Sequence, residues 1–256
     1  LRRHLLEELE LLIDLHKNAF RQGPGGDAET EIAIALAGLN RNMPLNILDI
    51  GCGTGASTLI LARLLNAKIT AVDFLQDFLD VLESRACSLG LEEKIIPLCV
   101  SMEELPFEDE QFDVIWSEGA IYNIGFNKGI ADWRRYLKPG GLLVASEITW
   151  TTSSRPSELQ SHWDSEYPEI GTASSKIKAI EDNGYSPVGY FVLPENCWLD
   201  NYYEPMRSNF QAFLSRHDNS EEAQSILKAE CQEIELYEKY KTYYSYGVYV
   251  AKKLFS

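Results

Sequence analysis

The sequence has a deficit of positive charge, and its basic residues form no large cluster. Its 23 lysine and arginine residues face 39 acidic residues, which gives a formal net charge of −16. A polyanion is repelled by such a field unless a basic patch offsets it. The doublets Arg134-Arg135 and Lys252-Lys253 are isolated from other basic residues. We therefore expect neither nucleic acid nor an anionic membrane surface as a partner.

Long apolar runs, paired cysteine motifs and metal-ligand spacings are also missing. No apolar run reaches the roughly 18 to 20 residues that a membrane-spanning helix needs, so we expect no membrane segment. The five cysteines are scattered and form no CxxC motif, which is typical of reduced thiols in a cytoplasmic protein. The four histidines show no ligand spacing with each other or with cysteine, so we predict no metal site.

Apolar strand-like and helix-like segments alternate through the middle of the chain. The expected strands cover residues 46–50, 68–72, 94–100, 112–116 and 142–147, and the expected helices cover 57–65, 78–89 and 127–137. Such alternation predicts a doubly wound α/β fold, in which helices cover both faces of a mostly parallel sheet. Ligands of this fold bind at the carboxyl ends of the strands.

The remaining segments complete a single domain over residues 1–256. Residues 1–40 are expected to form N-terminal helices, and 45–150 the ligand-binding core. Two β-prone segments after residue 184 bring the sheet to seven strands. The segments 150–171 and 201–240 are expected to be helical insertions that form a lid over the substrate.

A glycine-rich turn follows the first expected strand, in the run Ile47-Leu48-Asp49-Ile50-Gly51-Cys52-Gly53-Thr54-Gly55. Glycine lets the backbone approach a ligand closely, and the next helix offers free amide groups. Asp73 ends the second expected strand, where a carboxylate accepts hydrogen bonds from the hydroxyls of a ribose. Nicotinamide-dependent oxidoreductases and methyltransferases share this arrangement, so both classes stay open at this point.

Three further segments distinguish the two classes. Residues 101–107 read Ser-Met-Glu-Glu-Leu-Pro-Phe, 112–116 read Phe-Asp-Val-Ile-Trp, and 137–141 read Leu-Lys-Pro-Gly-Gly. With the glycine turn and Asp73, they resemble the class I S-adenosylmethionine-dependent methyltransferases in order and spacing. Segments 117–125 and 193–198 further resemble small bacterial and archaeal methyltransferases akin to the quinone-biosynthesis type. An NAD-dependent oxidoreductase thereby becomes a remote alternative.

The resemblance implies S-adenosylmethionine as the cofactor and S-adenosylhomocysteine as its product. At the methionine end, Gly51, Gly53 and Gly55 would pass under the cofactor. Asp49 would order the amine of the methionine part, directly or through water. Glu118, at the end of the fourth expected strand, would face the same end.

At the adenosine end, the resemblance implies that Asp73 holds the ribose and that Phe74 lies on the adenine face. Met102 would flank the adenine ring, with its backbone amide at a ring nitrogen. The family usually has aspartate where Ser101 stands. Adenine recognition would therefore rest on a neutral hydroxyl there, or shift to Glu103.

Methyl transfer from a sulfonium is an in-line displacement, in which alignment and exclusion of water supply most of the rate. A general base is needed only when the nucleophile arrives protonated, so we expect no catalytic triad. Tyr122 and Asn123 follow the fourth expected strand and Glu147 ends the fifth. We predict these three residues near the transferred methyl group. Structural roles are the alternative for Tyr122, as a lid residue, and for Glu147, as a cap or ion pair.

The expected insertions are rich in aromatic residues, which favours a planar or cationic acceptor through stacking and cation–π contacts. Acidic residues nearby would suit an amine. We predict that the acceptor site is walled by Trp150, Trp163, Tyr167, Trp198 and Tyr202. For each of these residues, packing of the lid is the alternative interpretation.

The sequence as a whole predicts a methyltransferase that acts on a small molecule. Residues 117–120 read Ser-Glu-Gly-Ala, whereas enzymes that methylate nucleic-acid bases commonly carry an Asn/Asp-Pro-Pro-aromatic turn there. The alternatives are a regulatory S-adenosylmethionine-binding protein without turnover and a methyltransferase of a macromolecule. The acceptor atom stays open, and so does the oligomeric state, with a homodimer as one alternative.

Overall fold

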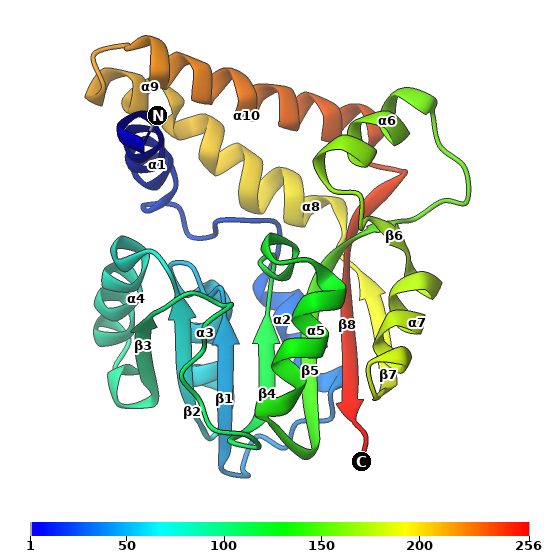
Figure 1. Ribbon diagram of the computed structural model, residues 1–256. Helices are drawn as coiled ribbons and strands as arrows, with labels where there is room; N and C mark the ends of the chain where they lie inside the picture. The colour runs from blue at the N-terminus through cyan, green and yellow to red at the C-terminus, as the bar shows by residue number, and fades with distance from the viewer. Residues whose placement is uncertain (1, 256) are drawn as a thin grey trace.

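One twisted β-sheet organises the chain, and the computed structural model describes it over residues 2–255, with side chains from residue 7 onward. The strand order is β3-β2-β1-β4-β5-β8-β7, and the short β6 pairs with β5 beside this path (Figure 1). The strands are β1 Leu45–Ile50, β2 Ala67–Asp73, β3 Ile95–Cys99, β4 Phe112–Ser117, β5 Leu137–Trp150, β6 Gly171–Thr172, β7 Tyr185–Val192 and β8 Tyr244–Lys253.

The sheet is mostly parallel, as the sequence predicts. β1 pairs in parallel with β2 and β4, and β2–β3 and β4–β5 are parallel too. Only β8 runs the other way, antiparallel to both β5 and β7. The predicted doubly wound fold is confirmed, and β6, a strand of two residues, adds an eighth strand to the predicted seven.

Helices of regular length and several short turns connect the strands. The α-helices are α1 Arg2–His16, α2 Asp27–Leu36, α3 Ala56–Leu64, α4 Gln76–Ser88, α5 Phe126–Trp133, α6 Ser157–Glu166, α7 Ala173–Asp182, α8 Glu195–Trp198, α9 Glu204–Arg216 and α10 Glu221–Tyr240. The short turns are η1 Glu92–Lys94, η2 Ile121–Asn123, η3 Arg134–Tyr136 and the π-helical η4 Leu199–Tyr203.

Alternating strand residues build a separate apolar core on each face of the sheet, because successive side chains point to opposite faces. On one face Ile47 and Val114 pack with residues of α2, α3 and α4. On the other face Leu48 and Ile115 pack with residues of α5 and α7. This arrangement leaves the carboxyl ends of the parallel strands uncovered by either helix layer.

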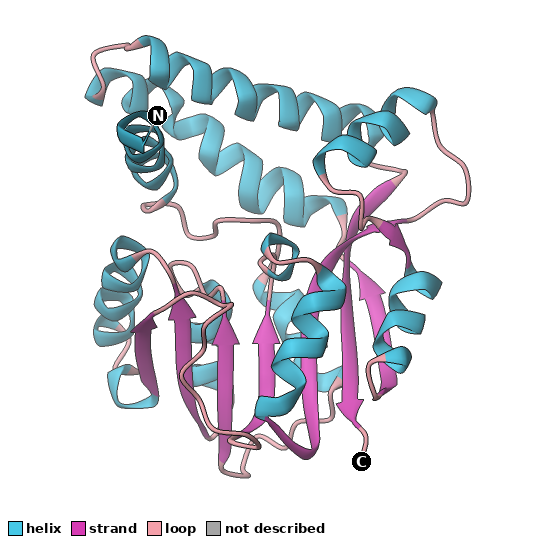
Figure 2. Ribbon diagram, viewed as in Figure 1, coloured by secondary structure: helices cyan, strands magenta, loops and turns pink. Residues whose placement is uncertain are grey.

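A third layer lies across those strand ends (Figure 2). It consists of α1, α9 and α10, which share a small apolar core of their own that includes Leu15 and Phe213. The chain between α1 and α2, residues 17–26, then crosses from this layer to the sheet (Figure 1). We call residues 17–26 the strap. No helix within residues 2–255 is both long and apolar enough to cross a membrane.

Several boundaries differ from the sequence prediction. The expected N-terminal helices are interrupted, because α1 ends at His16 and the strap then leaves the helical path to reach the sheet. β5 begins at Leu137 rather than at Leu142, and so includes the predicted turn at Pro139 to Gly141. A register shift between Phe112 and Val114 of β4 accommodates this irregular start.

Candidate functional site

A cavity of about 470 Å³ lies at the carboxyl ends of β1, β2 and β4, beneath the strap. Parallel strands bring their carboxyl ends to one edge of the sheet, so residues far apart in sequence meet there. Ten of the residues predicted from the sequence line the cavity: Gly51, Gly53, Asp73, Phe74, Ser101, Met102, Glu103, Glu118, Tyr122 and Asn123. Asp49, Gly55 and Glu147 lie outside this lining, and so do all five residues of the predicted aromatic wall.

The glycine turn after β1 needs glycine at its positions for steric reasons. Gly51 has a φ of +73°, and a Cβ there would lie 2.2 Å from the Cβ of Ala120. Gly53 has a φ of +56°, and a Cβ there would lie 2.6 Å from Oε1 of Gln22. Both positions therefore exclude a side chain, and the backbone forms the cavity floor directly.

Gly55 serves packing rather than the cavity. It has a φ of +91°, and a Cβ there would meet Cδ1 of Leu82 on α4 at 2.2 Å. The glycine precedes the first residue of α3 as its N-cap. The structure thus places this third glycine of the motif between α3 and α4.

Asp73, at the end of β2, presents its carboxylate to the cavity. Its Oδ2 accepts a hydrogen bond from the amide of Gly53 at 3.0 Å, and its Oδ1 accepts one from the amide of Leu75 at 3.0 Å. Burial raises the pKa of Asp73, while these amides lower it. Each carboxylate oxygen can accept a second hydrogen bond, which suits a pair of ligand hydroxyls.

The residues that we predicted to bind adenine line the same cavity as Asp73, and they lie on the segments that follow β2 and β3. Phe74 is 61% exposed, and the backbone oxygen of Met102 accepts a bond from Nε1 of Trp133 at 3.2 Å. Oγ of Ser101 accepts a bond from the amide of Glu103 at 3.2 Å. The carboxylate of Glu103 points instead toward Lys128, at 3.4 Å.

Asp49 lies under the glycine turn and is fully buried. Its Oδ2 accepts hydrogen bonds from Oγ1 of Thr58 at 2.6 Å and from Oγ of Ser57 at 3.2 Å. Its Oδ1 has no partner among the described residues. Burial raises the pKa of Asp49 to about 7. Asp49 therefore contacts the cavity only through Ser57, a lining residue at the start of α3.

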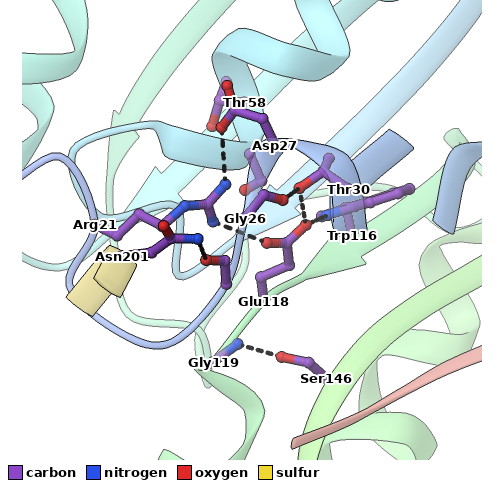
Figure 3. A network of polar contacts seen from close by, with 12 residues as sticks. Arg21, Gly26, Asp27, Thr30, Thr58, Trp116, Glu118, Gly119, Ser146 and Asn201 are labelled. Atoms are coloured by element: carbon purple, nitrogen blue, oxygen red, sulfur yellow. Dashed lines mark hydrogen bonds and ion pairs between the residues drawn. The ribbon is translucent and has the colours of Figure 1, made fainter. Parts of the chain in front are cut away.

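Glu118, at the end of β4, is held from three sides (Figure 3). Its Oε1 accepts bonds from Oγ1 of Thr30 and from Nε1 of Trp116, both at 2.9 Å. Its Oε2 accepts a bond from Nη1 of Arg21 at 3.3 Å. This buried guanidinium also pairs with Asp27. The carboxylate faces the cavity and ties the strap to the sheet.

The strap contributes cavity residues that sequence reasoning missed. Arg21 and Gln22 both line the cavity. Oε1 of Gln22 accepts bonds from the amide and hydroxyl of Thr54, at 2.9 and 3.0 Å. A second anchor is Arg85, which donates to the backbone oxygen of Ala19 at 2.9 Å. The only signal in the sequence is the helix-breaking run after residue 22, which predicts a loop without saying where it lies.

Tyr122 and Asn123 form part of η2, the turn that follows β4. The side chain of Tyr122 is 41% exposed, and its ring meets that of Tyr167 edge to face, with centroids 6.2 Å apart. Nδ2 of Asn123 donates to the backbone oxygen of Ala120 at 2.9 Å. Both residues line the cavity, and the asparagine also shapes the turn.

Glu147 does not reach the cavity. It is fully buried and pairs with Nζ of Lys176 at 2.6 Å. Burial raises the pKa of Glu147 to about 7 even though Lys176 lowers it. The sequence allowed Glu147 either a place near the transferred methyl group or a structural role such as an ion pair. The structure shows the ion pair.

The predicted aromatic wall is largely core. Trp150 and Trp198 are both 4% exposed. The ring of Trp198 stacks on Tyr237 at 4.3 Å and on Tyr246 at 5.3 Å between centroids. Trp163, Tyr167 and Tyr202 are partly buried against the same core. An aromatic-rich segment predicts burial of the rings, but composition does not indicate which rings face a ligand.

The cavity carries an excess of negative charge. Among the described residues that line it, three bear carboxylates and one bears a guanidinium, namely Asp73, Glu103, Glu118 and Arg21. Because the cavity is partly enclosed, such charges act on a ligand more strongly than they would in water. No group of side chains within the described chain has the arrangement of a metal site.

Comparison with known proteins agrees with this geometry. Residues 47–141 match a family model described as a methyltransferase domain. A demethylmenaquinone methyltransferase of Staphylococcus aureus is 30% identical over 111 residues, which is 42% of this chain and 45% of that protein. The chain spans about half the length of the curated relatives it matches.

Solved structures resemble the whole chain. A methyltransferase from Geobacter sulfurreducens in complex with S-adenosylhomocysteine has a TM-score of 0.82 at 18% identity, over 94% of this chain and 97% of that one. The structure titled [4+2]-cyclase SpnF has a TM-score of 0.76 at 20% identity, over 97% and 93% of the two chains. The chain therefore has the fold of these solved structures, and its residues 47–141 are similar to a methyltransferase domain.

Proposed function

We propose that the chain binds S-adenosylmethionine in the cavity under the strap and transfers its methyl group to a small molecule. The observation that carries the proposal is the charge of the cavity, where the carboxylates of Asp73 and Glu118 face one guanidinium, that of Arg21. S-adenosylmethionine carries a sulfonium and an ammonium against one carboxylate. A nicotinamide dinucleotide carries a pyrophosphate, which this cavity would repel.

The residues present fit this cofactor from end to end. Asp73 would accept hydrogen bonds from the ribose hydroxyls, and Ser101 and Met102 would flank the adenine. Gly51 and Gly53 offer a surface that a Cβ would block. When bound, the cofactor supplies a methyl group on a sulfonium, already activated for attack by a nucleophile.

Arg21 and Glu118 would receive the charged methionine end. Their guanidinium and carboxylate form a pair in which each group keeps bonding capacity toward the cavity. Arg21 suits the carboxylate of the amino acid part, and Glu118 suits its ammonium. The strap would therefore order around the cofactor as it binds.

A small-molecule acceptor is supported by the enclosure of the cavity and by the charge of the chain. The strap and the lid helices α9 and α10 cover the strand ends (Figure 1). The net charge of −16 opposes a polyanionic substrate. Tyr122 is the side chain of the turn after β4 that faces the cavity, and we propose that it lies beside the acceptor.

Calorimetric titration with S-adenosylhomocysteine tests the cofactor, with NADH as the control ligand. We expect saturable binding at one site for the first compound and no binding of the second. Binding of NADH in its place would overturn the proposal. The likeness to a cyclase makes turnover a separate question. Transfer of labelled methyl from S-adenosylmethionine to a panel of small acceptors answers it, and cofactor binding without transfer to any acceptor would favour a protein that uses the fold differently.

Asp73→Ala tests the ribose assignment. Loss of a charged hydrogen-bond acceptor costs about 1.5–3 kcal/mol, so the affinity for S-adenosylhomocysteine should fall about tenfold or more. Asp77→Ala removes the same charge from an exposed position on α4 and should leave the affinity unchanged. A melting temperature for each variant checks folding. Equal affinities of the two variants would remove the assignment.

A further inference from the structure

A second cavity, of about 340 Å³, lies between the strap and the lid helix α9. The last turn of α1 supplies Leu15 and His16 to its lining, and η4 supplies Tyr202. α1 and α9 are fixed to each other here, since Nδ2 of Asn209 donates to the backbone oxygen of Leu15 at 3.0 Å. The second cavity is thus built on helices that pack against one another (Figure 1).

Two residues line both cavities, His16 and Arg21. Arg21 pairs with Glu118, and we placed this pair at the methionine end of the cofactor. A ligand in the second cavity would therefore meet the cofactor at the end that carries the sulfonium. A methyl acceptor has to be aligned with that end, so the second cavity has the position that an acceptor site needs.

The walls of the second cavity include buried apolar side chains and two aromatic rings. Leu15 and Met206 are 1% and 3% exposed. The ring of Phe20 is half exposed, and the guanidinium of Arg85 lies 5.3 Å from its centroid. Tyr202 supplies the second ring. Aromatic rings pair favourably with one another beyond the area that they bury, so these walls suit a planar aromatic ligand.

The charge of the second cavity differs from that of the cofactor cavity. Among the described residues that line it, none carries a carboxylate, whereas Arg21 carries a positive charge. An ammonium ion would leave water there without an anionic partner, which is costly. A neutral aromatic hydroxyl meets no such cost.

His16 offers a hydrogen-bond acceptor for such a hydroxyl. Its Nε2 pairs with Oε1 of Glu230 on α10 at 3.2 Å, and the two side chains are 14% and 13% exposed. A carboxylate at Nε2 favours the tautomer with its proton on that nitrogen. Nδ1 then keeps a lone pair, which can accept a hydrogen bond from a ligand. Glu230 is in this view a positioning residue that acts through His16.

We propose that the second cavity binds the methyl acceptor and selects a phenol, with the aromatic ring against Phe20 and Tyr202 and the hydroxyl at His16. The inference rests on the proposed function, because it assigns the second substrate beside the same cofactor. Of the five residues of the predicted aromatic wall, Tyr202 is the one that lines this cavity.

The test compares phenols with compounds of the same skeleton that lack the hydroxyl, 7-hydroxycoumarin against coumarin and 4-hydroxyacetophenone against acetophenone. Each compound is titrated calorimetrically into protein saturated with S-adenosylhomocysteine. We expect each phenol to bind at one site, about two- to tenfold more tightly than its counterpart, which is the contribution of one hydrogen bond.

His16→Phe identifies the group that receives the hydroxyl. Phenylalanine keeps an aromatic ring at this position but cannot accept a hydrogen bond, so the preference for phenols should vanish. The control is His217→Phe. His217 also pairs with a carboxylate, that of Asp14 at 2.9 Å, but lines neither cavity. This control variant should keep the preference.

Ser208→Trp locates the bound phenol. Ser208 lines the second cavity but not the cofactor cavity, so tryptophan there should abolish phenol binding while S-adenosylhomocysteine still binds. Ser215→Trp is the matched control. Both serines are exposed on α9, and each donates at 2.9 Å to the backbone oxygen four residues earlier. Ser215→Trp should bind the phenols as the unaltered protein does.

The outcomes separate the two proposals. Failure of S-adenosylhomocysteine to bind the unaltered protein would contradict the proposed function, and the four probes are then titrated without it. Absence of phenol binding, or equal affinities for a phenol and its counterpart, overturns the assignment of the second cavity. So does a preference that persists in His16→Phe, or phenol binding that survives Ser208→Trp.

Discussion

Gly55 and Gly90 both adopt positive φ, at +91° and +66°, but only one of them faces a side chain. A Cβ at Gly55 would lie 2.2 Å from Cδ1 of Leu82, whereas a Cβ at Gly90 meets nothing within 4 Å. Left-handed backbone costs roughly 1–2 kcal/mol for a residue with a Cβ, and forcing a methyl into a packed site adds about 1–3 kcal/mol. Gly55→Ala should therefore destabilise the protein more than Gly90→Ala.

Urea unfolding of both alanine variants measures the difference. The free energy of unfolding should fall by about 1–3 kcal/mol more for Gly55→Ala, the overpacking cost alone. In a Leu82→Ala background, where the opposing side chain is short, Gly55→Ala should cost no more than Gly90→Ala does. If both single variants lose the same free energy of unfolding, then α4 moves away from the new methyl group at no cost.

Asp49 should make the stability depend on pH. Its pKa rises from 3.8, the ordinary value of an aspartate side chain, to about 7 in the folded protein. The folded state therefore holds the proton more tightly, so this contribution is present below pH 4 and is lost as pH rises through 7. Each unit of pKa shift corresponds to about 1.4 kcal/mol.

Asp49→Asn removes the titration while keeping an acceptor for Ser57 and Thr58. The stability of this variant relative to the unaltered protein should improve as pH rises from 5 to 8, by an amount on the order of a few kcal/mol. Melting curves across that range provide the measurement, with the exposed Asp77→Asn as control. A difference that does not change with pH would mean that Asp49 ionises normally.

Sequence reasoning located single residues well where a strand end fixed them. Asp73 ends β2 and Glu118 directly follows β4, and one edge of the sheet brings them to the same cavity. It missed Arg21, because a single cation in a loop has no periodicity and its position depends on where the strap crosses. It allowed an ion pair for Glu147 but did not indicate the partner, Lys176, which lies 29 positions away.

At the scale of elements, the strap is the segment whose hold on the sheet can be tested directly. Gln22 accepts two hydrogen bonds from Thr54. Gln22→Ala should lower the free energy of unfolding by about 1–2 kcal/mol, because each bond contributes about 0.5–1.5 kcal/mol. Hydrogen exchange should accelerate at the amides of residues 17–26 and at Thr54, and should slow again when S-adenosylhomocysteine binds.

Gln76→Ala is the matched control, since Gln76 bonds only to the exposed Asp80 on its own helix. That variant should leave exchange in the strap unchanged. Exchange that accelerates throughout the sheet in Gln22→Ala would instead mean that the strap is part of the folding core.

The predicted elements were most accurate where the apolar pattern was regular. β1, β2 and β4 lie within one or two residues of the predicted ranges, because buried strands in a parallel sheet are continuous apolar runs. β5 was predicted too short, since the Lys138-Pro139-Gly140-Gly141 run has the composition of a turn yet lies inside the strand, as an irregularity between the pairs Phe112–Leu137 and Val114–Leu142. The aromatic residues of the insertions indicated burial correctly, but Trp198 stacks between Tyr237 and Tyr246 rather than facing the cavity.

For the whole molecule, cofactor binding should appear as added stability. A ligand at about one hundred times its dissociation constant stabilises the folded state by about 2.7 kcal/mol. S-adenosylhomocysteine should therefore raise the melting temperature by several degrees, and NADH at the same concentration should not. An equal rise with both compounds would contradict a cavity that discriminates by charge.

The lid segment between β7 and β8 leaves and rejoins the sheet at adjacent points. Val192 pairs with Gly247, and the amide of Leu193 donates to the backbone oxygen of Tyr246 at 2.9 Å. A segment with adjacent ends can change in length at little entropic cost to the sheet, because loop-closure entropy grows slowly with length. Residues 194–243 can thus be exchanged as one unit where the stacking of Trp198 on Tyr246 and the core that α9 and α10 share with α1 are kept. We expect that exchanging this segment between relatives changes the acceptor and leaves the proposed cofactor cavity unchanged. Residues 193 and 244 are then the points at which such chimaeras should be joined.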